Sequence, residues 1–276
     1  MLMIDGMGLP PRGLTDSVYE RFCPADFVRL LGRATPVDAS MGVPGIPQSA
    51  TGQTSLFTGI NAARLVGAHL QGFPGAALRR VLEQNNLFSC LRQAGREVAF
   101  ANAYVRFSLE ELTHMRLRSV TTVMTQAALG AVRGLQELLD GNAVYHDLTH
   151  RTIAGEIGIP ACSPREAARH LLELAARHDF TLFEYFLTDH AGHRCDETEL
   201  GKVLGELGEF FCTLAASAAE RCTIVLTSDH GNCEDLTTKA HTRNPVPLLV
   251  LGQPHNLLLP NKIEEICPFV AQVLCG

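Results

Sequence analysis

Three short apolar segments of this chain are each followed, within two residues, by an aspartate. The segments are Met1–Ile4, Thr181–Leu187 and Thr223–Thr227, and the last two lead into the sequences TDHAGH and SDHGN. Their length and their content of β-branched and aromatic residues predict buried strands. Because open α/β sheets bind ligands beyond the carboxyl ends of their strands, the three aspartates are expected to meet at one edge of such a sheet.

Segments with helical character alternate with these strands. Ser163 and Glu166 can form a capping box around Pro164, which begins a helix that leads into the second strand. Asp196 can cap another helix, which runs to about residue 219 and leads into the third strand. The predicted fold class is therefore α/β, with a mostly parallel central sheet sandwiched by helices. The same pattern predicts a helix at Leu87–Ala94, strands at Val98–Ala103 and 246–252, and a closing helix at Ile263–Leu274.

The segment 106–159 interrupts this alternation. Its β-prone stretch Ser119–Met124 and its helical stretch Ala127–Leu139 lead to no further Asp or His motif. We therefore expect a small inserted cap at 106–159, between two parts of an α/β core at 1–105 and 160–276. The segment carries arginines that could cover the site and select substrates, namely Arg106, Arg116, Arg118, Arg133 and Arg151.

The composition indicates a soluble enzyme and excludes several other classes of protein. The 276 residues are 46% hydrophobic and carry a formal net charge of −6 without a long basic run, so we expect neither nucleic acid nor an anionic membrane surface as a partner. No segment has the 18 consecutive apolar residues of a membrane span, and only four residues precede Asp5, so we expect neither a membrane span nor a signal peptide. The nine cysteines are odd in number and include no CxxC pair, which favours reduced thiols and a cytoplasmic location.

The aspartates and histidines near the strand ends form a set suited to divalent metal ions. Each Asp-His or Asp-Gly pair taken singly is more often a turn or a helix cap, but the combination supplies the six or seven converging groups that two adjacent sites require. Imidazole nitrogen and carboxylate oxygen suit Zn²⁺ and Mn²⁺ alike, so the choice between them stays open. The candidate ligands are Asp5, Ser49, Asp189, His193, Asp229, His230 and His241.

The motifs MIDGMG, SATGQTSLFTG, TDHAGH, SDHGNCED and AHTRNPVPLLV resemble, in this order, the metalloenzyme core of the alkaline phosphatase superfamily. The branch closest in appearance contains cofactor-independent phosphoglycerate mutase and phosphopentomutase. In this family a Ser or Thr nucleophile opens a strand-to-helix turn. Aligning SATGQTSLFTG by its glycines and leucine assigns that role to Ser49, with Thr51 and Thr54 as alternatives.

The resemblance also implies how the ligands divide between two metal ions. One ion would be held by Asp189, His193 and His241. The other would be held by Asp5, Asp229, His230 and the oxygen of Ser49. Four further residues near the motifs are expected to contact substrate, namely Gln53, His190, Lys239 and Arg243.

Three functions follow from these motifs. The first is a two-metal phosphoester hydrolase that acts on a small phosphorylated metabolite through a phosphoserine. The second is a phosphomutase, which motif similarity favours, although too few residues separate Ser49 from Asp189 to hold a full phosphoglycerate-binding domain. The third is an inactive metal-binding relative, which is disfavoured because all seven ligand positions hold competent side chains. The motifs specify neither the substrate nor the oligomeric state.

Overall fold

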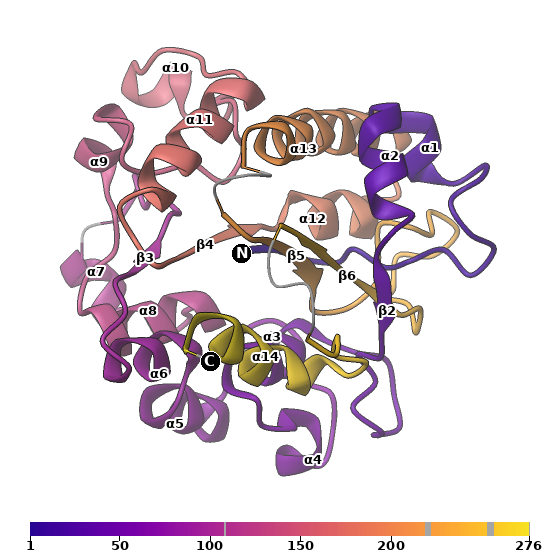
Figure 1. Ribbon diagram of the computed structural model, residues 1–276, viewed down its shortest axis with the longest axis horizontal. Helices are drawn as coiled ribbons and strands as arrows, with labels where there is room; N and C mark the ends of the chain where they lie inside the picture. The colour runs from indigo at the N-terminus through magenta and orange to yellow at the C-terminus, as the bar shows by residue number, and fades with distance from the viewer. Residues whose placement is uncertain (108, 219–221, 253–256, 276) are drawn as a thin grey trace.

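The computed structural model describes residues 1–107, 109–218, 222–252 and 257–275, which form one α/β unit around a central sheet (Figure 1). The described residues make a six-stranded sheet in the order β2-β6-β5-β1-β4-β3. Strand β1 pairs in parallel with β4 and β5, and β3 pairs in parallel with β4, whereas β6 runs antiparallel to both β5 and β2. The strands are β1 Leu2–Ile4, β2 Thr35–Val37, β3 Val98–Phe100, β4 Phe180–Tyr185, β5 Ile224–Ser228 and β6 Val246–Leu251.

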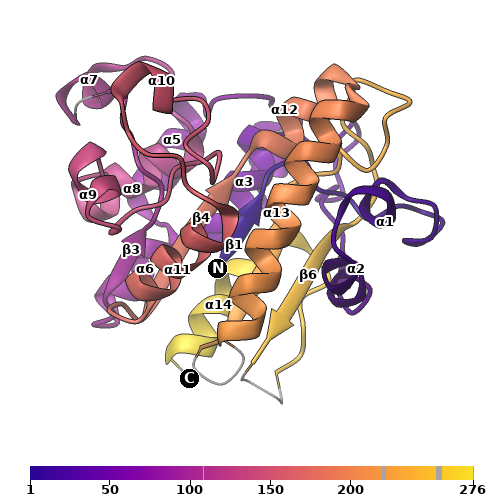
Figure 2. The ribbon, with the colours of Figure 1, turned by 90° about the horizontal axis from the view of Figure 1, so that it is seen from above.

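Helices cover both faces of this sheet, as the alternating pattern predicts. Side chains of β1 alternate between the two faces: Leu2 and Ile4 belong to one core cluster and Met3 to the other. Figure 2 shows the long helix α13 lying along the first face. That face carries α1 Val18–Phe22, α2 Ala25–Leu31, α11 Pro164–Ala175, α12 Leu187–Arg194 and α13 Glu197–Ala218. The second face carries α3 Ser49–Thr58, α4 Ala62–Val66, α5 Ala76–Gln84, α6 Leu87–Gln93, α8 Val120–Leu129, the short 3-10 helix η1 Ile263–Glu265 and α14 Ile266–Cys275.

The predicted helix caps are present. The Ser163 hydroxyl accepts from the Glu166 backbone N–H, and Glu166 in turn accepts from the Ser163 N–H, with Pro164 in the first turn of α11. Asp196 Oδ1 accepts from the backbone N–H groups of Thr198 and Glu199 at 3.0 Å each and so caps α13. These caps set where α11 and α13 begin.

The structure corrects the prediction for the stretch Ser119–Met124, which is helical and not β-like. Ser119 is the N-cap of α8, and its hydroxyl accepts from the Thr122 N–H. Val120, Val123 and Met124 are buried in the second core cluster, so N-capping and packing against α5 and α6 outweigh the β propensity of these residues. The helix predicted over Ala127–Leu139 is also divided in two.

Gly130 is the feature that divides this predicted helix. It ends α8 in the left-handed conformation at φ 73°, and a separate helix α9 follows at Leu135–Leu139. Because α8 packs into the core, part of the segment predicted to form a cap lies within the helical layer of the second face. The inserted cap at 106–159 therefore stays a prediction. Among the described residues of this segment, the other helices are α7 Leu109–His114 and α10 Ala154–Ile157.

All nine cysteines are free thiols in the structure. Among the described residues, no helix combines the length and the apolar character needed to cross a membrane.

Candidate metal centre

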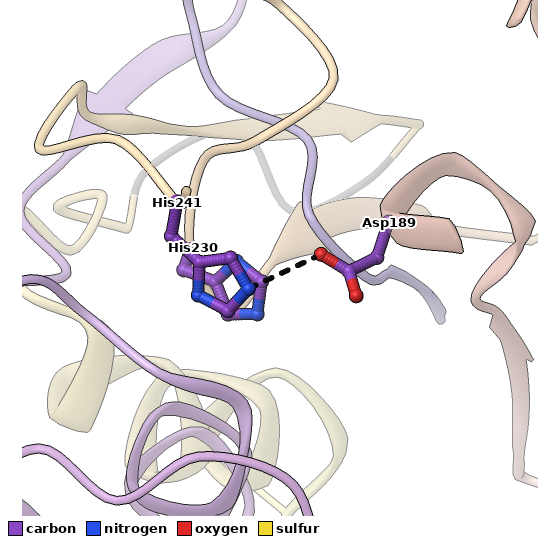
Figure 3. A group of neighbouring side chains, drawn as sticks. All are labelled: Asp189, His230 and His241. Atoms are coloured by element: carbon purple, nitrogen blue, oxygen red, sulfur yellow. Dashed lines mark ion pairs between the residues drawn. The ribbon is translucent and has the colours of Figure 1, made fainter. Parts of the chain in front are cut away.

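The predicted ligands converge at the carboxyl edge of the sheet. Asp5 follows β1 directly, and Asp229 and His230 follow β5. Asp189 differs from the expectation: β4 ends at Tyr185, and Asp189 lies in the first turn of α12. Figure 3 shows Asp189 pointing toward the rings of His230 and His241, which lie one over the other. The ring centroids of this histidine pair are 3.7 Å apart, with an interplanar angle of 12°.

One group of ligand atoms is formed by Asp189, His193 and His241. His193 Nε2 lies 3.3 Å from Asp189 Oδ2, His241 Nε2 lies 3.4 Å from Asp189 Oδ1, and the two Nε2 atoms are 3.0 Å apart. The other ring nitrogen of each histidine donates to a backbone carbonyl, from His193 to Lys239 at 2.7 Å and from His241 to Pro47 at 2.9 Å. These bonds fix the rings so that their Nε2 atoms face the carboxylate.

A second group surrounds His230. Its Nε2 lies 3.2 Å from Asp5 Oδ1, 3.5 Å from Asp229 Oδ2 and 2.9 Å from Ser49 Oγ. Asp5, Asp229 and His230 are buried. His230 also lies near the first group, since one ligand atom each from Asp189, His230 and His241 falls within 4.8 Å of the others. The two groups therefore adjoin at His230.

The electrostatics of this cluster fit bound cations. Burial raises the pKa of Asp5 well above its usual value, the neighbouring Asp229 raises it further, and burial likewise raises the pKa of Asp229. Burial alone would lower the pKa of His230, but the neighbouring carboxylates of Asp229 and Asp5 outweigh burial and raise this pKa to about 10. The pKa of His241 shifts the other way, because burial and the neighbouring His230 lower it to about 4. Asp5 Oδ1 has no hydrogen-bond partner although it is buried. The only close polar contact described for this oxygen is the 3.2 Å approach of His230 Nε2. Imidazole nitrogens that face buried carboxylates in this way are a donor set that divalent cations would satisfy.

Gln53 and Gly52 bring α3 against this cluster. Gln53 Nε2 donates to Asp5 Oδ2 at 3.0 Å and to Asp229 Oδ2 at 2.9 Å, so its amide holds the two carboxylates together. A Cβ atom at Gly52 would lie 2.7 Å from the Asp229 carbonyl oxygen. Only glycine therefore lets the first turn of α3, which begins at Ser49, approach the loop after β5 this closely.

Glu234 links the loops that carry the candidate ligands, a role not predicted from the sequence. This buried carboxylate accepts from the Gly8 N–H at 3.0 Å, the Asn232 N–H at 2.8 Å, Asn244 Nδ2 at 3.0 Å and the Thr242 hydroxyl. These donors come from the loops after β1, after β5 and around His241. Glu234 lies inside the motif SDHGNCED, but its partners are too far away in the sequence for the motif to reveal them.

A pocket of about 470 Å³ opens beside the cluster and is lined in part by Asp5, Ser49, Gln53 and Asp189. Of the other residues predicted to contact substrate, His190 lines this pocket. Lys239 and Arg243 have exposed side chains and do not line it. Of the five arginines in the predicted cap, Arg106 alone is among the described lining residues.

Glu184 is a further acidic residue of this pocket that was not predicted. It lies on β4, is buried, and accepts a hydrogen bond from the Thr121 hydroxyl on α8. Burial raises the pKa of Glu184 to about 7, although the bond from Thr121 opposes this shift. The signal in the sequence is a single charged residue within the run FTLFEYF, which fits a strand with one position facing a pocket.

Replacing Glu184 by glutamine should stabilise the metal-free protein above pH 7. The pKa of Glu184 is raised from its usual 4.5 to about 7, so the stability contributed by its protonated form is complete below pH 4.5 and is lost as the pH rises to 7. This difference corresponds to about 3 kcal/mol in the free energy of unfolding. Urea unfolding of wild type and Glu184→Gln should therefore diverge with rising pH and agree near pH 4.5.

Glu83→Gln, at an exposed position of α5, controls for the loss of one negative charge. A pH-independent difference between Glu184→Gln and wild type would contradict the assignment of a buried carboxyl group that resists ionisation.

Comparison with known proteins identifies the family. The model of the Metalloenzyme superfamily matches residues 48–268. The 2,3-bisphosphoglycerate-independent phosphoglycerate mutases of Desulforudis audaxviator and Moorella thermoacetica are each 27% identical over 124 residues, a match that covers 42% of this chain and 24% of each relative. The chain thus matches about a quarter of the length of these relatives.

Solved structures share the fold at low sequence identity. A cold-active alkaline phosphatase from Shewanella sp. superposes with a TM-score of 0.61 at 11% identity, covering 99% of both chains. The PH0037 protein from Pyrococcus horikoshii gives a TM-score of 0.59 at 15% identity, covering 99% of this chain and 95% of that one. These findings confirm the resemblance to the alkaline phosphatase superfamily and the predicted α/β fold class. The family model spans most of the chain, and the chain therefore belongs to the Metalloenzyme superfamily.

Proposed function

We propose that this protein is a two-metal phosphoryl-transfer enzyme, specifically a phosphoester hydrolase that acts on a small phosphorylated metabolite through a phosphoserine at Ser49. The observation that carries the proposal is the position of the Ser49 hydroxyl. Ser49 is the first residue of α3, its Oγ lies 2.9 Å from His230 Nε2, and it lines the pocket beside the cluster. A helix N-terminus favours an anion, so a phosphoryl group on Ser49 would lie in a favourable field.

The distances in the cluster support the two ligand sets that the resemblance implies. Bound divalent cations, Mn²⁺ or Zn²⁺, would supply positive charge that lowers the pKa of the Ser49 hydroxyl and neutralises the transferring phosphoryl group. The proposed sets are Asp189, His193 and His241 for one ion, and Asp5, Asp229, His230 and Ser49 for the other.

The residues around the ligands have defined roles in this proposal. Gln53 holds the carboxylates of Asp5 and Asp229 in place, and Glu234 fixes three ligand loops relative to one another. His190 lines the pocket and is proposed to contact substrate. The backbone carbonyl oxygen of Lys239 accepts a hydrogen bond from His193 and so orients that imidazole. Arg243 is exposed and is proposed to contact only a larger substrate.

A phosphomutase is the second candidate, and the matched phosphoglycerate mutases favour it. A mutase must return the phosphoryl group to its substrate and so must keep water out of the site. The hydrolase is preferred because only 139 residues separate Ser49 from Asp189, too few for a full phosphoglycerate-binding domain between them. An inactive relative is disfavoured, since the seven proposed ligands are all competent side chains at one sheet edge.

The test is release of inorganic phosphate from a panel of phosphomonoesters, including sugar phosphates, by Mn²⁺-loaded and Zn²⁺-loaded protein. Release by wild type but not by Ser49→Ala would support a serine-dependent hydrolase. Intact metal binding without any release would count against hydrolysis, and isomerisation of a phosphorylated substrate would then favour the mutase.

A further inference from the structure

Aromatic and imidazole rings account for seven of the sixteen described residues that line the pocket beyond the proposed metal ligands. Six others are polar, namely Gln53, Asn102, Arg106, Ser119, Thr122 and Glu184. A pocket of about 470 Å³ has room for a phosphate and a ring system. The rings belong to Phe73, Tyr104, Phe107, Tyr145 and Phe186, together with the imidazoles of His146 and His190.

Four of these rings form a continuous series that ends at the metal centre. Tyr145 and His146 have ring centroids 4.1 Å apart, and His146 stacks on Phe186 at 4.7 Å with an interplanar angle of 30°. Phe186 in turn lies 5.2 Å from the ring of His190, which follows the ligand Asp189 in sequence. A planar group attached to a phosphate bound at Ser49 would therefore have aromatic faces and edges within reach.

Two phenylalanines in this wall are far more exposed than large apolar side chains usually are. Phe73 is 49% exposed and Phe107 is 46% exposed, and both line the pocket. Exposed apolar side chains that gather at a pocket, and are not scattered singly over the surface, are typical of a binding site for an apolar group. Covering them with a ligand would remove apolar surface from water.

The same wall offers little to a second anionic group on the substrate. Among the described lining residues, Arg106 is the only lysine or arginine, and its guanidinium is paired with Glu156 at 2.7 Å. Burial lowers the pKa of His146 to about 4, so this imidazole is neutral near pH 7. For the carboxylate of a small phosphorylated acid, this wall provides one cationic side chain, Arg106, which is already paired with Glu156. The wall also contains the buried acidic residue Glu184.

We propose that the substrates of this site are phosphomonoesters whose alcohol part carries a planar aromatic or heteroaromatic ring, and not small phosphorylated acids. This inference rests on the proposed function, because it takes Ser49 and the metal ligands as the place where the phosphate binds. The ring would belong to an aryl group or to a nucleobase, because the aromatic side chains of the wall can pack against either kind of planar ring.

The test compares pairs of esters that differ in the ring but share a primary alcohol as leaving group. One pair is 3-phenylpropyl phosphate and propyl phosphate, and the other is adenosine 5′-monophosphate and ribose 5-phosphate. Calorimetric titration into Mn²⁺-loaded Ser49→Ala protein gives dissociation constants without turnover. We expect the ring to tighten binding by about tenfold in at least one pair, and the pair affected distinguishes an aryl group from a nucleobase.

Variants at the pocket mouth test whether the aromatic wall causes the preference. Combining Phe73→Ala and Phe107→Ala, in the same Ser49→Ala background, should reduce the ring preference several-fold. Leu139→Ala is the matched control, because Leu139 is 54% exposed on α9 and does not line the pocket. The control should keep the preference of the parent protein.

Equal affinities within both pairs would overturn the inference. The inference would also be overturned if 3-phosphoglycerate bound more tightly than both ring-bearing esters. These outcomes are separate from failure of the proposed function. That function fails if wild type releases no phosphate from any ester, whereas the ring preference is measured by binding alone.

Discussion

Replacing Ser49 by alanine is expected to lower kcat/KM for phosphate release by about 10³-fold or more while leaving the metal content unchanged. The hydroxyl is the only group removed, and loss of a covalent nucleophile has effects of this order in other hydrolases. Asp5, Asp229 and His230 remain to hold the cation, since their positions depend on the loops after β1 and β5. Steady-state kinetics and elemental analysis of the purified variant measure the two quantities.

The neighbouring threonines of α3 supply the controls. Thr51 Oγ1 donates to the Gln48 carbonyl and accepts from the Leu70 N–H, and Thr54 Oγ1 donates to the Ala50 carbonyl. Both hydroxyls are thus engaged with backbone, so Thr51→Ala and Thr54→Ala should keep most of the activity. An inactive Thr51→Ala beside an active Ser49→Ala would show that the nucleophile had been aligned wrongly.

Replacing His230 by alanine should abolish turnover and weaken retention of one metal ion by more than about 100-fold. His230 is fully buried between the two groups of ligands, and its Nε2 faces Asp5, Asp229 and the Ser49 hydroxyl. Loss of a ligand should exceed the 10- to 100-fold effect typical of residues that merely orient one. Asp229→Ala should have the same consequences. The measurement is metal content after dialysis against a weak chelator, with activity assayed on the same samples.

His178→Ala is the matched control for the removal of an imidazole. His178 follows α11, and its Nδ1 bonds to the Leu174 carbonyl near the amino end of β4, away from the ligands. This variant should retain both metal and activity. Full activity of His230→Ala or Asp229→Ala would refute the proposed ligand set.

The sequence was sufficient to predict the fold class and the edge of the sheet where the candidate ligands meet. Apolar runs that end in Asp and His motifs, with capped helices between them, have few arrangements other than a parallel sheet covered on both faces. Helix N-caps are local interactions, so Ser163 and Asp196 could be assigned from spacing alone. The antiparallel direction of β6 was not predicted, because it depends on how the chain returns to the sheet and not on residue spacing.

Features that depend on tertiary packing were predicted wrongly or missed. The β-branched run Val120–Val123 is helical because it is capped by Ser119 and buried against α5 and α6. Glu184 was missed because one charged residue does not alter the strand pattern of its neighbours. Glu234 was missed because its donors Gly8 and Asn244 lie on other loops. The aromatic wall was missed for the same reason, since its rings come from four separate parts of the chain.

The most direct test of a phosphoserine at Ser49 is mass spectrometry of Mn²⁺-loaded protein quenched in acid during turnover of a phosphoester. We expect one phosphoryl group on the peptide that contains Ser49, and none on that peptide from the Ser49→Ala protein. Continued turnover with no phosphorylated peptide, or with the phosphoryl group on Thr51 or Thr54, would contradict the assignment of Ser49 as the nucleophile.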